Sequence, residues 1–501
     1  MTSTTRWGHP RGLSTLFFTE LWERFSYYGM RGLLILYMTA PVTGGGLGFD
    51  TARAGAIYGL YAGLVYFACL PGGWLADRVL GAQRATIIGG TLILSGHLCL
   101  AYPSFDTFYL GLGLVVLGTG LLKPNVSTMV GHLYQADDPR RDGGYSLYYM
   151  GINLGAFLAP LACGWLALSD PFREFLGRSG VNPALAWHWG FGAAALGMAL
   201  GLISFVRGSH QLSPQSARPA TAVDVSGVMV VRGAVVVALI AVCGTVIMRA
   251  GIFDVARLSN LFGLFLLVLT AAFFMWIFAD RRWTPTERHQ LRLIFVLFLA
   301  AVVFWSLFEQ GGSTLNLFAA RNTDRVIASL GFEFPATWYQ SLNPILIIAL
   351  APCFAWGWVR LGRRNPSSSS KFIIGLVFVA AGFAVLIPAA RLAGTGINVS
   401  PWWLVATYGL HTVGELCLSP VGLNAMSRLA PARIASLTMG VWFLATSIGN
   451  YLGGRAASLY DTLGLAELFT VITALGLIAA GVLAGVVRVM PRAPSTLSGE
   501  S

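Results

Sequence analysis

Apolar stretches long enough to cross a lipid bilayer recur along the whole of this 501-residue chain. A helix needs about 20 mainly apolar residues to span a hydrocarbon core about 30 Å thick. We expect fourteen such helices, grouped as six, two and six. Their approximate ranges are 15–40, 52–76, 84–103, 107–130, 144–168 and 186–206, then 231–249 and 257–279, then 290–313, 338–360, 372–392, 402–427, 434–458 and 464–488. The sequence therefore predicts an integral membrane protein that consists almost entirely of helices.

The composition fits a chain that has lipid as its solvent. Hydrophobic residues make up 55% of the sequence and charged residues only 11%, against about 25% charged residues in a soluble domain. A net charge of +12 would point to nucleic acid in a soluble protein, but here the basic residues lie in short loops between the apolar stretches. The six cysteines form no CxxC pair, so we expect no metal site. We also expect no cofactor, no nucleic-acid partner and no enzymatic activity, because no nucleophile–base pair or phosphate-binding loop occurs.

The loop charges predict the orientation of the chain. Arg6 and Arg11 precede the first apolar stretch, and every second loop after it is also basic. The loops between these carry fewer basic residues. Because cytoplasmic loops carry an excess of Lys and Arg, we expect both termini in the cytoplasm, with the chain crossing the inner (plasma) membrane many times.

The first apolar stretch contains side chains that lipid does not accommodate. A charged residue at the centre of a membrane helix costs about 2.5–3.5 kcal/mol on insertion scales. At about 100° per residue, the ionisable and tyrosine side chains form a stripe about 60° wide with one residue on each flank. The stripe contains Glu20, Arg24, Tyr27 and Arg31, flanked by Glu23 and Tyr28. Such a stripe predicts a face turned towards a water-filled cavity or a partner helix, and a purely structural ion-pair lattice is the alternative.

Three further charges stand alone in other apolar stretches: Lys123, Glu309 and Glu415. Burial disfavours the charged form of a carboxyl group, whereas a nearby base favours it. A buried carboxyl group can therefore exchange a salt bridge for a proton as its partners come and go, which is the physical basis of a proton-coupled gate. A site that carries both signs of charge also suits a zwitterionic substrate.

Several of these residues stand in motifs that resemble the proton-dependent oligopeptide transporter (POT) family of the major facilitator superfamily. Residues 20–29 read ELWERFSYYG and contain every fixed position of the family signature ExxERFxYYG. Residues 148–155, YYMGINLG, are similar to the second family signature. Residues 72–81, GGWLADRVLG, resemble a loop motif of the superfamily. The stretches 304–310, 340–344 and 414–422 are also similar to the family, so the resemblance covers nearly the whole chain.

The resemblance implies an all-α membrane protein with the major facilitator fold. This fold would consist of two six-helix bundles plus two extra transmembrane helices, 14 in total. We expect the N-terminal bundle at residues 1–207, a linker with the two additional helices at 208–288, and the C-terminal bundle at 289–501.

The resemblance also implies how a peptide would be held. Arg24 and Lys123 would bind the peptide carboxylate, and Glu415, with Asn153 and Asn343, its amino group. Aromatic and small polar side chains would line the rest of the pocket. These are Tyr27, Tyr28, Tyr66, Trp305, Trp442 and Ser419.

Roles in coupling and gating follow from the same resemblance. Glu20, Glu23 and Glu309 would couple protonation to transport. Salt bridges between Arg31 and Glu309, and between Lys123 and Glu415, would form and break between the bundles during the transport cycle.

The sequence thus predicts a proton-coupled symporter that imports di- and tripeptides by alternating access and functions as a monomer. One alternative keeps the fold and changes the solute, for example to nitrate. Relatives of that kind tend to lose parts of the first signature or the lysine, and this chain keeps both. A second alternative is a peptide sensor that does not transport, which would be expected to carry an added signalling domain.

Overall fold

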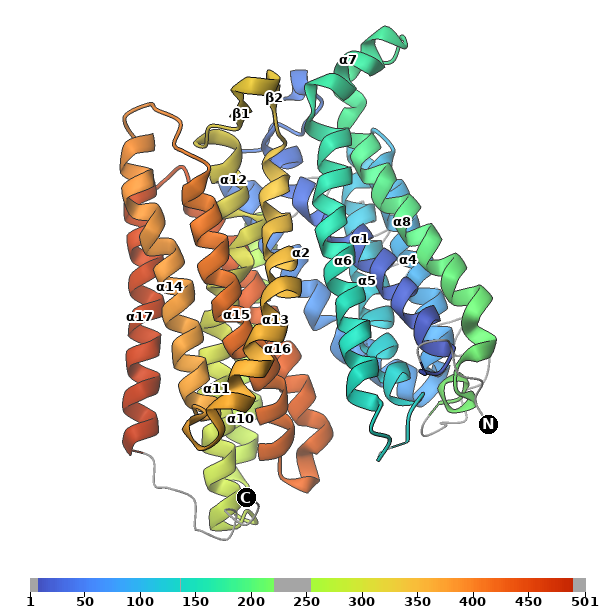
Figure 1. Ribbon diagram of the computed structural model, residues 1–501, viewed down its shortest axis with the longest axis vertical. Coiled ribbons are helices and arrows are strands. Elements are labelled where there is room, and N and C mark those ends of the chain that lie inside the picture. Colours follow the sequence, from blue (N-terminus) through green and yellow to red (C-terminus); the bar gives the residue numbers. More distant parts are fainter. Residues whose placement is uncertain (1–7, 136, 220–253, 490–501) are drawn as a thin grey trace.

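The computed structural model describes residues 8–135, 137–219 and 254–489. Long helices lie side by side along the vertical axis of Figure 1, and the described part contains only one small β-hairpin. We call the face where α1 begins and α17 ends the lower face, and the opposite face the upper face. Ten helical segments of the described part are long and apolar enough to cross a membrane. The prediction of a helical membrane protein is therefore confirmed.

The long helices form two sets, each packed mainly within itself. The first set, on the right of Figure 1, consists of α1 (Gly12–Thr39), α2 (Thr51–Phe67) with its continuation α3 (Cys69–Leu75), α4 (Ala82–Ala101), α5 (Phe105–Gly131), α6 (Arg141–Leu168) and α8 (Ala186–Gly208). The second set, on the left, consists of α11 (Pro285–Phe308), α13 (Leu342–Leu361), α14 (Ser368–Ala393), α15 (Trp402–Leu429), α16 (Ala435–Ala456) and α17 (Leu465–Val489). Each of these helices coincides with a predicted span.

The predicted pair of additional helices is seen in part. Helix α10 (Val255–Ala279) coincides with the second member and packs against α2 and α16. Its Phe262 ring meets the Tyr451 ring edge-on, with 5.8 Å between the ring centroids. The first member, predicted at 231–249, lies outside the described residues.

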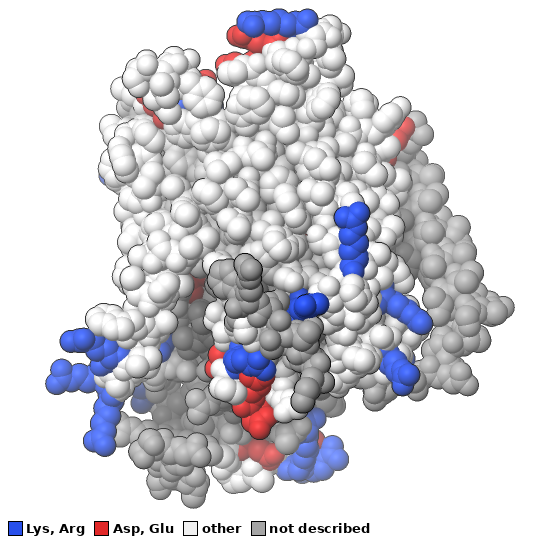
Figure 2. All heavy atoms as spheres, turned by 45° about the vertical axis from the view of Figure 1, so that its right-hand side comes forward, with Lys and Arg blue, Asp and Glu red and all other residues white. Residues whose placement is uncertain are grey.

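Short elements gather at the upper face. They are α7 (Asp170–Arg178), α12 (Thr314–Arg321) and the antiparallel strands β1 (Val326–Ile327) and β2 (Phe332–Glu333). On the side of the molecule shown in Figure 2, charged side chains collect towards the two ends, and the band between them is mostly uncharged. This distribution is what a bilayer requires of a chain that crosses it.

The two sets approach most closely where α2 crosses α16. A Cβ atom added to Gly59 would lie 2.7 Å from the carbonyl oxygen of Tyr451, and one added to Gly454 would collide with the backbone of Gly59. The Ser447 hydroxyl donates a hydrogen bond of 2.8 Å to the carbonyl of Gly63. Small residues allow such close backbone approach between membrane helices, so these glycines set the distance between the sets.

We predict that Gly454→Val lowers the Tm of the purified protein in detergent, because overpacking a tight contact costs about 1–3 kcal/mol. Gly481→Val is the matched control, because a Cβ atom at Gly481 meets nothing within 4 Å. Equal Tm values for the two variants would contradict a tight α2–α16 contact.

Candidate functional site

A cavity of about 400 Å³ lies between the two sets, and we call it the central cavity. Its walls come from α1, α2, α5 and α6 on one side and from α11, α13, α15 and α16 on the other. Most of the side chains predicted from the sequence line it. They are Glu20, Arg24, Tyr28, Arg31, Tyr66, Lys123, Asn153, Trp305, Glu309, Asn343, Glu415, Ser419 and Trp442.

Helix α1 supplies a buried group of one base and two acids. The Arg24 guanidinium donates to both carboxylate oxygens of Glu23, with Nη2 2.7 Å from Oε1. Its Nε also lies 3.2 Å from Oε1 of Glu20, one helical turn away. All three residues are buried. With both carboxylates ionised the group would have a net negative charge, so it has the capacity to hold an added proton beside Arg24.

Two predicted residues of α1, Glu23 and Tyr27, do not line the central cavity. Glu23 is fully buried and reaches the site only through Arg24. Tyr27 is also buried, and its ring lies 5.1 Å from the Arg24 guanidinium carbon. The lining face of α1 runs through Glu20, Arg24 and Tyr28, so Glu23 and Tyr27 fall on its flank. The prediction that Tyr27 lines the pocket is therefore wrong for this structure.

Arg31 joins the two sets through an ion pair with Glu309. The Arg31 Nη2 also donates to the carbonyl of Glu309 at 3.1 Å, and its Nε donates to the Tyr58 hydroxyl at 2.7 Å. Both charged side chains are only 7% exposed. Helix α11 ends just before Glu309, and a Cβ atom at Gly312 would lie 2.9 Å from Arg31 Nε. The break in the helix and its glycine thus make room for the guanidinium.

Lys123 and Glu415 line the same cavity with different partners. The Lys123 ammonium lies over the Tyr66 ring, 3.8 Å from its centroid. The Glu415 carboxylate accepts a hydrogen bond of 2.8 Å from Nδ2 of Asn343. In the part of the chain that the structure describes, no ion pair joins Lys123 to Glu415. The cavity therefore presents positive charge from the first set and a carboxylate from the second.

The remaining predicted residues complete the wall. The Trp305 and Trp442 rings meet edge-on, with 6.3 Å between their centroids. Asn153 lines the cavity while its Nδ2 donates to the Tyr149 carbonyl at 2.9 Å. The aromatic pair offers an apolar surface beside the charged groups.

Sequence reasoning missed several residues of the site. Tyr58 binds Arg31, and Tyr149, Gln340 and Tyr408 line the cavity. Tyr408 stands seven residues before Glu415, so helical periodicity places both on one face of α15 and was a signal for it. Nothing local marks Tyr58, because its partner comes from another helix.

The chain is similar in sequence to known membrane transporters. The PTR2 family model, described as the POT family, matches residues 83–473. The chain belongs to the POT family, whose members are transporters. The peptide transporter YePEPT of Yersinia enterocolitica subsp. palearctica serotype O:3 (strain YE-P4) is 43% identical over 475 residues, which cover 90% of this chain and 88% of that protein. The di-/tripeptide transporter of Lactococcus lactis subsp. cremoris is 36% identical over 496 residues, which cover 95% of each.

A solved structure shows the same architecture. The crystal structure of the peptide transporter POT in complex with sulfate matches with a TM-score of 0.86 at 39% identity, covering 97% of this chain and 96% of that one. The predicted major facilitator fold with two helix bundles is thereby confirmed.

Hydrogen bonds join the two bundles of this POT family member on the upper side of the central cavity. Asn316 Nδ2 donates to the carbonyl of Gly32 at 2.7 Å. Thr337, Trp338 and Ser341 of the 3-10 helix Ala336–Ser341 donate to carbonyls of α6 at 3.1, 3.2 and 2.8 Å. These contacts lie at the end of the central cavity nearer the upper face, where Arg31 and Glu309 also line it. The two bundles therefore touch on the upper side of the cavity.

We predict that Glu309→Gln destabilises the protein by about 3–5 kcal/mol, because it leaves the Arg31 guanidinium buried without its counter-charge. The double variant Arg31→Met/Glu309→Leu should recover much of this loss, since an apolar pair of similar size often replaces a buried ion pair at little cost. The measurement is a thermal and denaturant double-mutant cycle in detergent.

Glu174→Gln serves as the surface control for this cycle. It breaks the exposed Arg178–Glu174 pair of 3.1 Å and should cost at most about 1 kcal/mol. If the losses in unfolding free energy of the two single variants simply add in the double variant, Arg31 and Glu309 are not energetically coupled and the prediction is wrong.

Proposed function

We propose that this chain is a proton-coupled symporter that imports di- and tripeptides by alternating access. The observation that carries the proposal is the pairing of opposite charges across the central cavity, with Arg24 and Lys123 on one wall and Glu415 on the other. Every short peptide has a carboxylate at one end and an ammonium at the other, so this arrangement suits short peptides in general and does not select one sequence. The relatives named as peptide and di-/tripeptide transporters support the same function.

The substrate roles follow from which charges have partners. Arg24 is already bound by two carboxylates, whereas Lys123 lies against an aromatic ring and has an ammonium available for a peptide carboxylate. Asn343 holds Glu415 in place to receive the amino group, and Asn153 lies in the same wall. Tyr28, Tyr66, Trp305, Trp442 and Ser419 would then surround the peptide side chains.

Proton coupling is assigned to Glu20, Glu23 and Glu309. A peptide carboxylate that approaches Arg24 adds a third negative charge to a group that already contains Glu20 and Glu23. A proton on either carboxyl group offsets this repulsion, so peptide and proton favour each other's binding. Protonation of Glu309 would release Arg31 and with it the contacts on the upper side.

The motion involves the two bundles as units, with residues 1–207 in one, 289–501 in the other and 208–288 as the linker that contains the additional helices. We assign the lower face to the cytoplasm, which places both termini there in a chain of the inner membrane. The structure then has its outer side closed. In this assignment the Lys123–Glu415 bridge forms at another stage of the cycle, and a single chain contains the complete pathway, so the transporter functions as a monomer.

The direct test is uptake of labelled dialanine by purified protein in liposomes, with an acid bath outside and an inside-negative potential. We expect concentrative uptake that a protonophore abolishes. Lys123→Ala should reduce it about 10- to 100-fold, the loss expected for one charge-assisted contact. Lys371→Ala is the matched control, because Lys371 lies over the Trp358 ring, away from the cavity lining. No uptake by well-folded protein would refute peptide import.

Glu23→Gln separates coupling from binding. We expect it to abolish uptake driven by the proton gradient but to leave exchange of labelled for unlabelled dialanine partly intact, because Glu23 meets Arg24 and does not line the cavity. Glu174→Gln on the exposed α7 should change neither. Equal loss of uptake and exchange in Glu23→Gln would rule out this role.

A further inference from the structure

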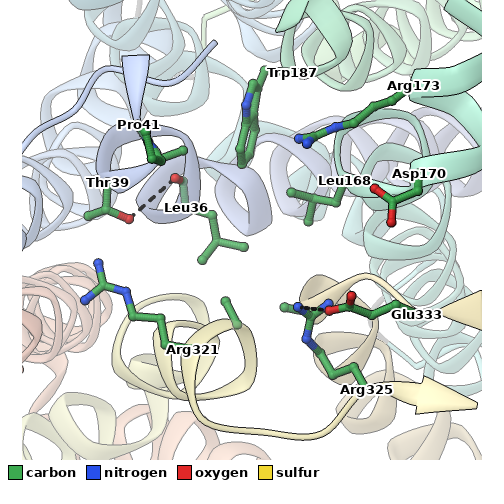
Figure 3. Close-up of a pocket in the computed structure, with 13 residues that line it drawn as sticks. Leu36, Thr39, Pro41, Leu168, Asp170, Arg173, Trp187, Arg321, Arg325 and Glu333 are labelled. Atoms are coloured by element: carbon green, nitrogen blue, oxygen red, sulfur yellow. Dashed lines mark hydrogen bonds and ion pairs between the residues drawn. The ribbon is translucent and has the colours of Figure 1, made fainter. Parts of the chain in front are cut away.

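A second cavity, of about 300 Å³, lies at the upper face between the same two bundles. Figure 3 shows its lining, and we call it the upper cavity. One wall is formed by the ends of α1 and α6, by α7 and by the start of α8, and the other by α12 and the β-hairpin. Asp170 of this lining is exposed, so the upper cavity is open to the medium at that face.

Asp170 and Arg173 have opposite charges and both line the upper cavity, but they do not pair with each other. Asp170 and Arg173 stand three residues apart on α7, yet no ion pair joins them in the described part of the chain. The Arg173 guanidinium has one hydrogen bond, of 3.3 Å to the Ala167 carbonyl, and its buried Nε has no partner among the described residues. Both side chains face the cavity in Figure 3. They are therefore available to a ligand.

The facing wall also carries both signs of charge. Arg325 pairs with Glu333 and donates to the Phe334 carbonyl at 2.7 Å, and its buried Nε has no described partner. Arg321 binds Asp461 at 3.2 Å. In Figure 3 Asp170, Arg173, Arg325 and Glu333 lie on the right and Arg321 on the left. The cavity lining thus combines three arginines with two carboxylates, and Glu333 already has Arg325 as its partner.

We propose that the upper cavity binds a small zwitterion, an amino acid or a dipeptide, with its carboxylate on Arg173 and its ammonium on Asp170. A simple anion would pair with Arg173 and leave Asp170 without a counter-charge, and a simple cation would leave Arg173 without one, whereas a zwitterion satisfies both. A guanidinium with free N–H groups is a strong donor to a carboxylate. The volume suits a ligand of one or two residues.

Occupancy of this site has a consequence for transport that rests on the proposed function. Asp170 and Arg173 belong to the first bundle, and Arg321, Arg325 and Glu333 to the second, so the cavity around a bound zwitterion is complete only while the bundles touch at the upper face. A ligand shifts an equilibrium towards the state that it binds better. A zwitterion in the outer medium would therefore hold the outer side closed and slow import at high concentration.

The test is equilibrium binding of labelled dialanine to the full chain in lipid nanodiscs, in a Lys123→Ala background that weakens the central site. We expect saturable binding to remain. Adding Arg173→Gln or Asp170→Asn should weaken it at least about tenfold, the loss of one charge-assisted contact. Arg178→Gln, on the same helix but outside the cavity lining, should leave it unchanged.

Competitors define the ligand chemistry. N-acetyl-dialanine lacks the ammonium and dialanine amide lacks the carboxylate, so neither should displace the label. Displacement by free alanine would identify amino acids as ligands, and displacement by unlabelled dialanine alone would identify short peptides. Equal displacement by N-acetyl-dialanine would replace the zwitterion site with a plain anion site and overturn the proposal.

Two further outcomes would also overturn it: no saturable binding in the Lys123→Ala background, or binding that Arg173→Gln and Asp170→Asn leave unchanged. None of these measurements requires transport. Failure of dialanine uptake in liposomes therefore refutes the proposed function without touching the upper site, and loss of the upper site leaves the proposed function standing.

Discussion

The cost of placing charge inside a membrane governs the interior of this protein. An ionisable side chain in a spanning helix needs a counter-charge, a hydrogen-bond partner or water. The Arg31 guanidinium finds its hydrogen-bond and ion-pair partners outside its own helix, namely Tyr58, the Glu309 carboxylate and the Glu309 carbonyl. Because two of these belong to the opposite bundle, the requirement to compensate one charge also ties the two halves together.

The same requirement makes the interior responsive to protons. Arg24 stands between Glu20 and Glu23, so one guanidinium pairs with two acids, and with both acids ionised the group has a net negative charge. Charges in a low-dielectric interior interact strongly. In the proposed function, the arrival of a substrate charge would therefore alter which carboxyl group holds a proton, and so link binding, protonation and contact between the bundles.

Close backbone packing fixes where the bundles meet in this structure. The α2–α16 crossing brings Gly59 against Gly454, and the 3-10 helix Ala336–Ser341 donates hydrogen bonds to α6 carbonyls on the same side of the central cavity. Both contacts combine close packing at small residues with side-chain donors to backbone carbonyls of the opposite bundle. The upper cavity lies beyond them, with walls from both bundles and charges that the protein itself leaves unpaired.

The sequence by itself determined the helices and the charged stripe on the first of them. Span length and the 3.6-residue period are local properties, and so Glu20, Arg24 and Arg31 were predicted to share a face before any neighbour was known. The family resemblance then implied pocket residues on seven further helices, and these residues line the central cavity.

Only the tertiary structure decided which partner each charge has. Lys123 lies against the Tyr66 ring and not against Glu415. Arg31 donates one of its hydrogen bonds to the Tyr58 hydroxyl, and Tyr27 lies beside the central cavity and not in its wall. Asp170 and Arg173 are close enough in sequence to predict a surface ion pair, yet each turns towards a cavity whose other wall comes from the second bundle. Pairing in a membrane interior depends on distances between segments far apart in the chain, and a local pattern contains no such distances.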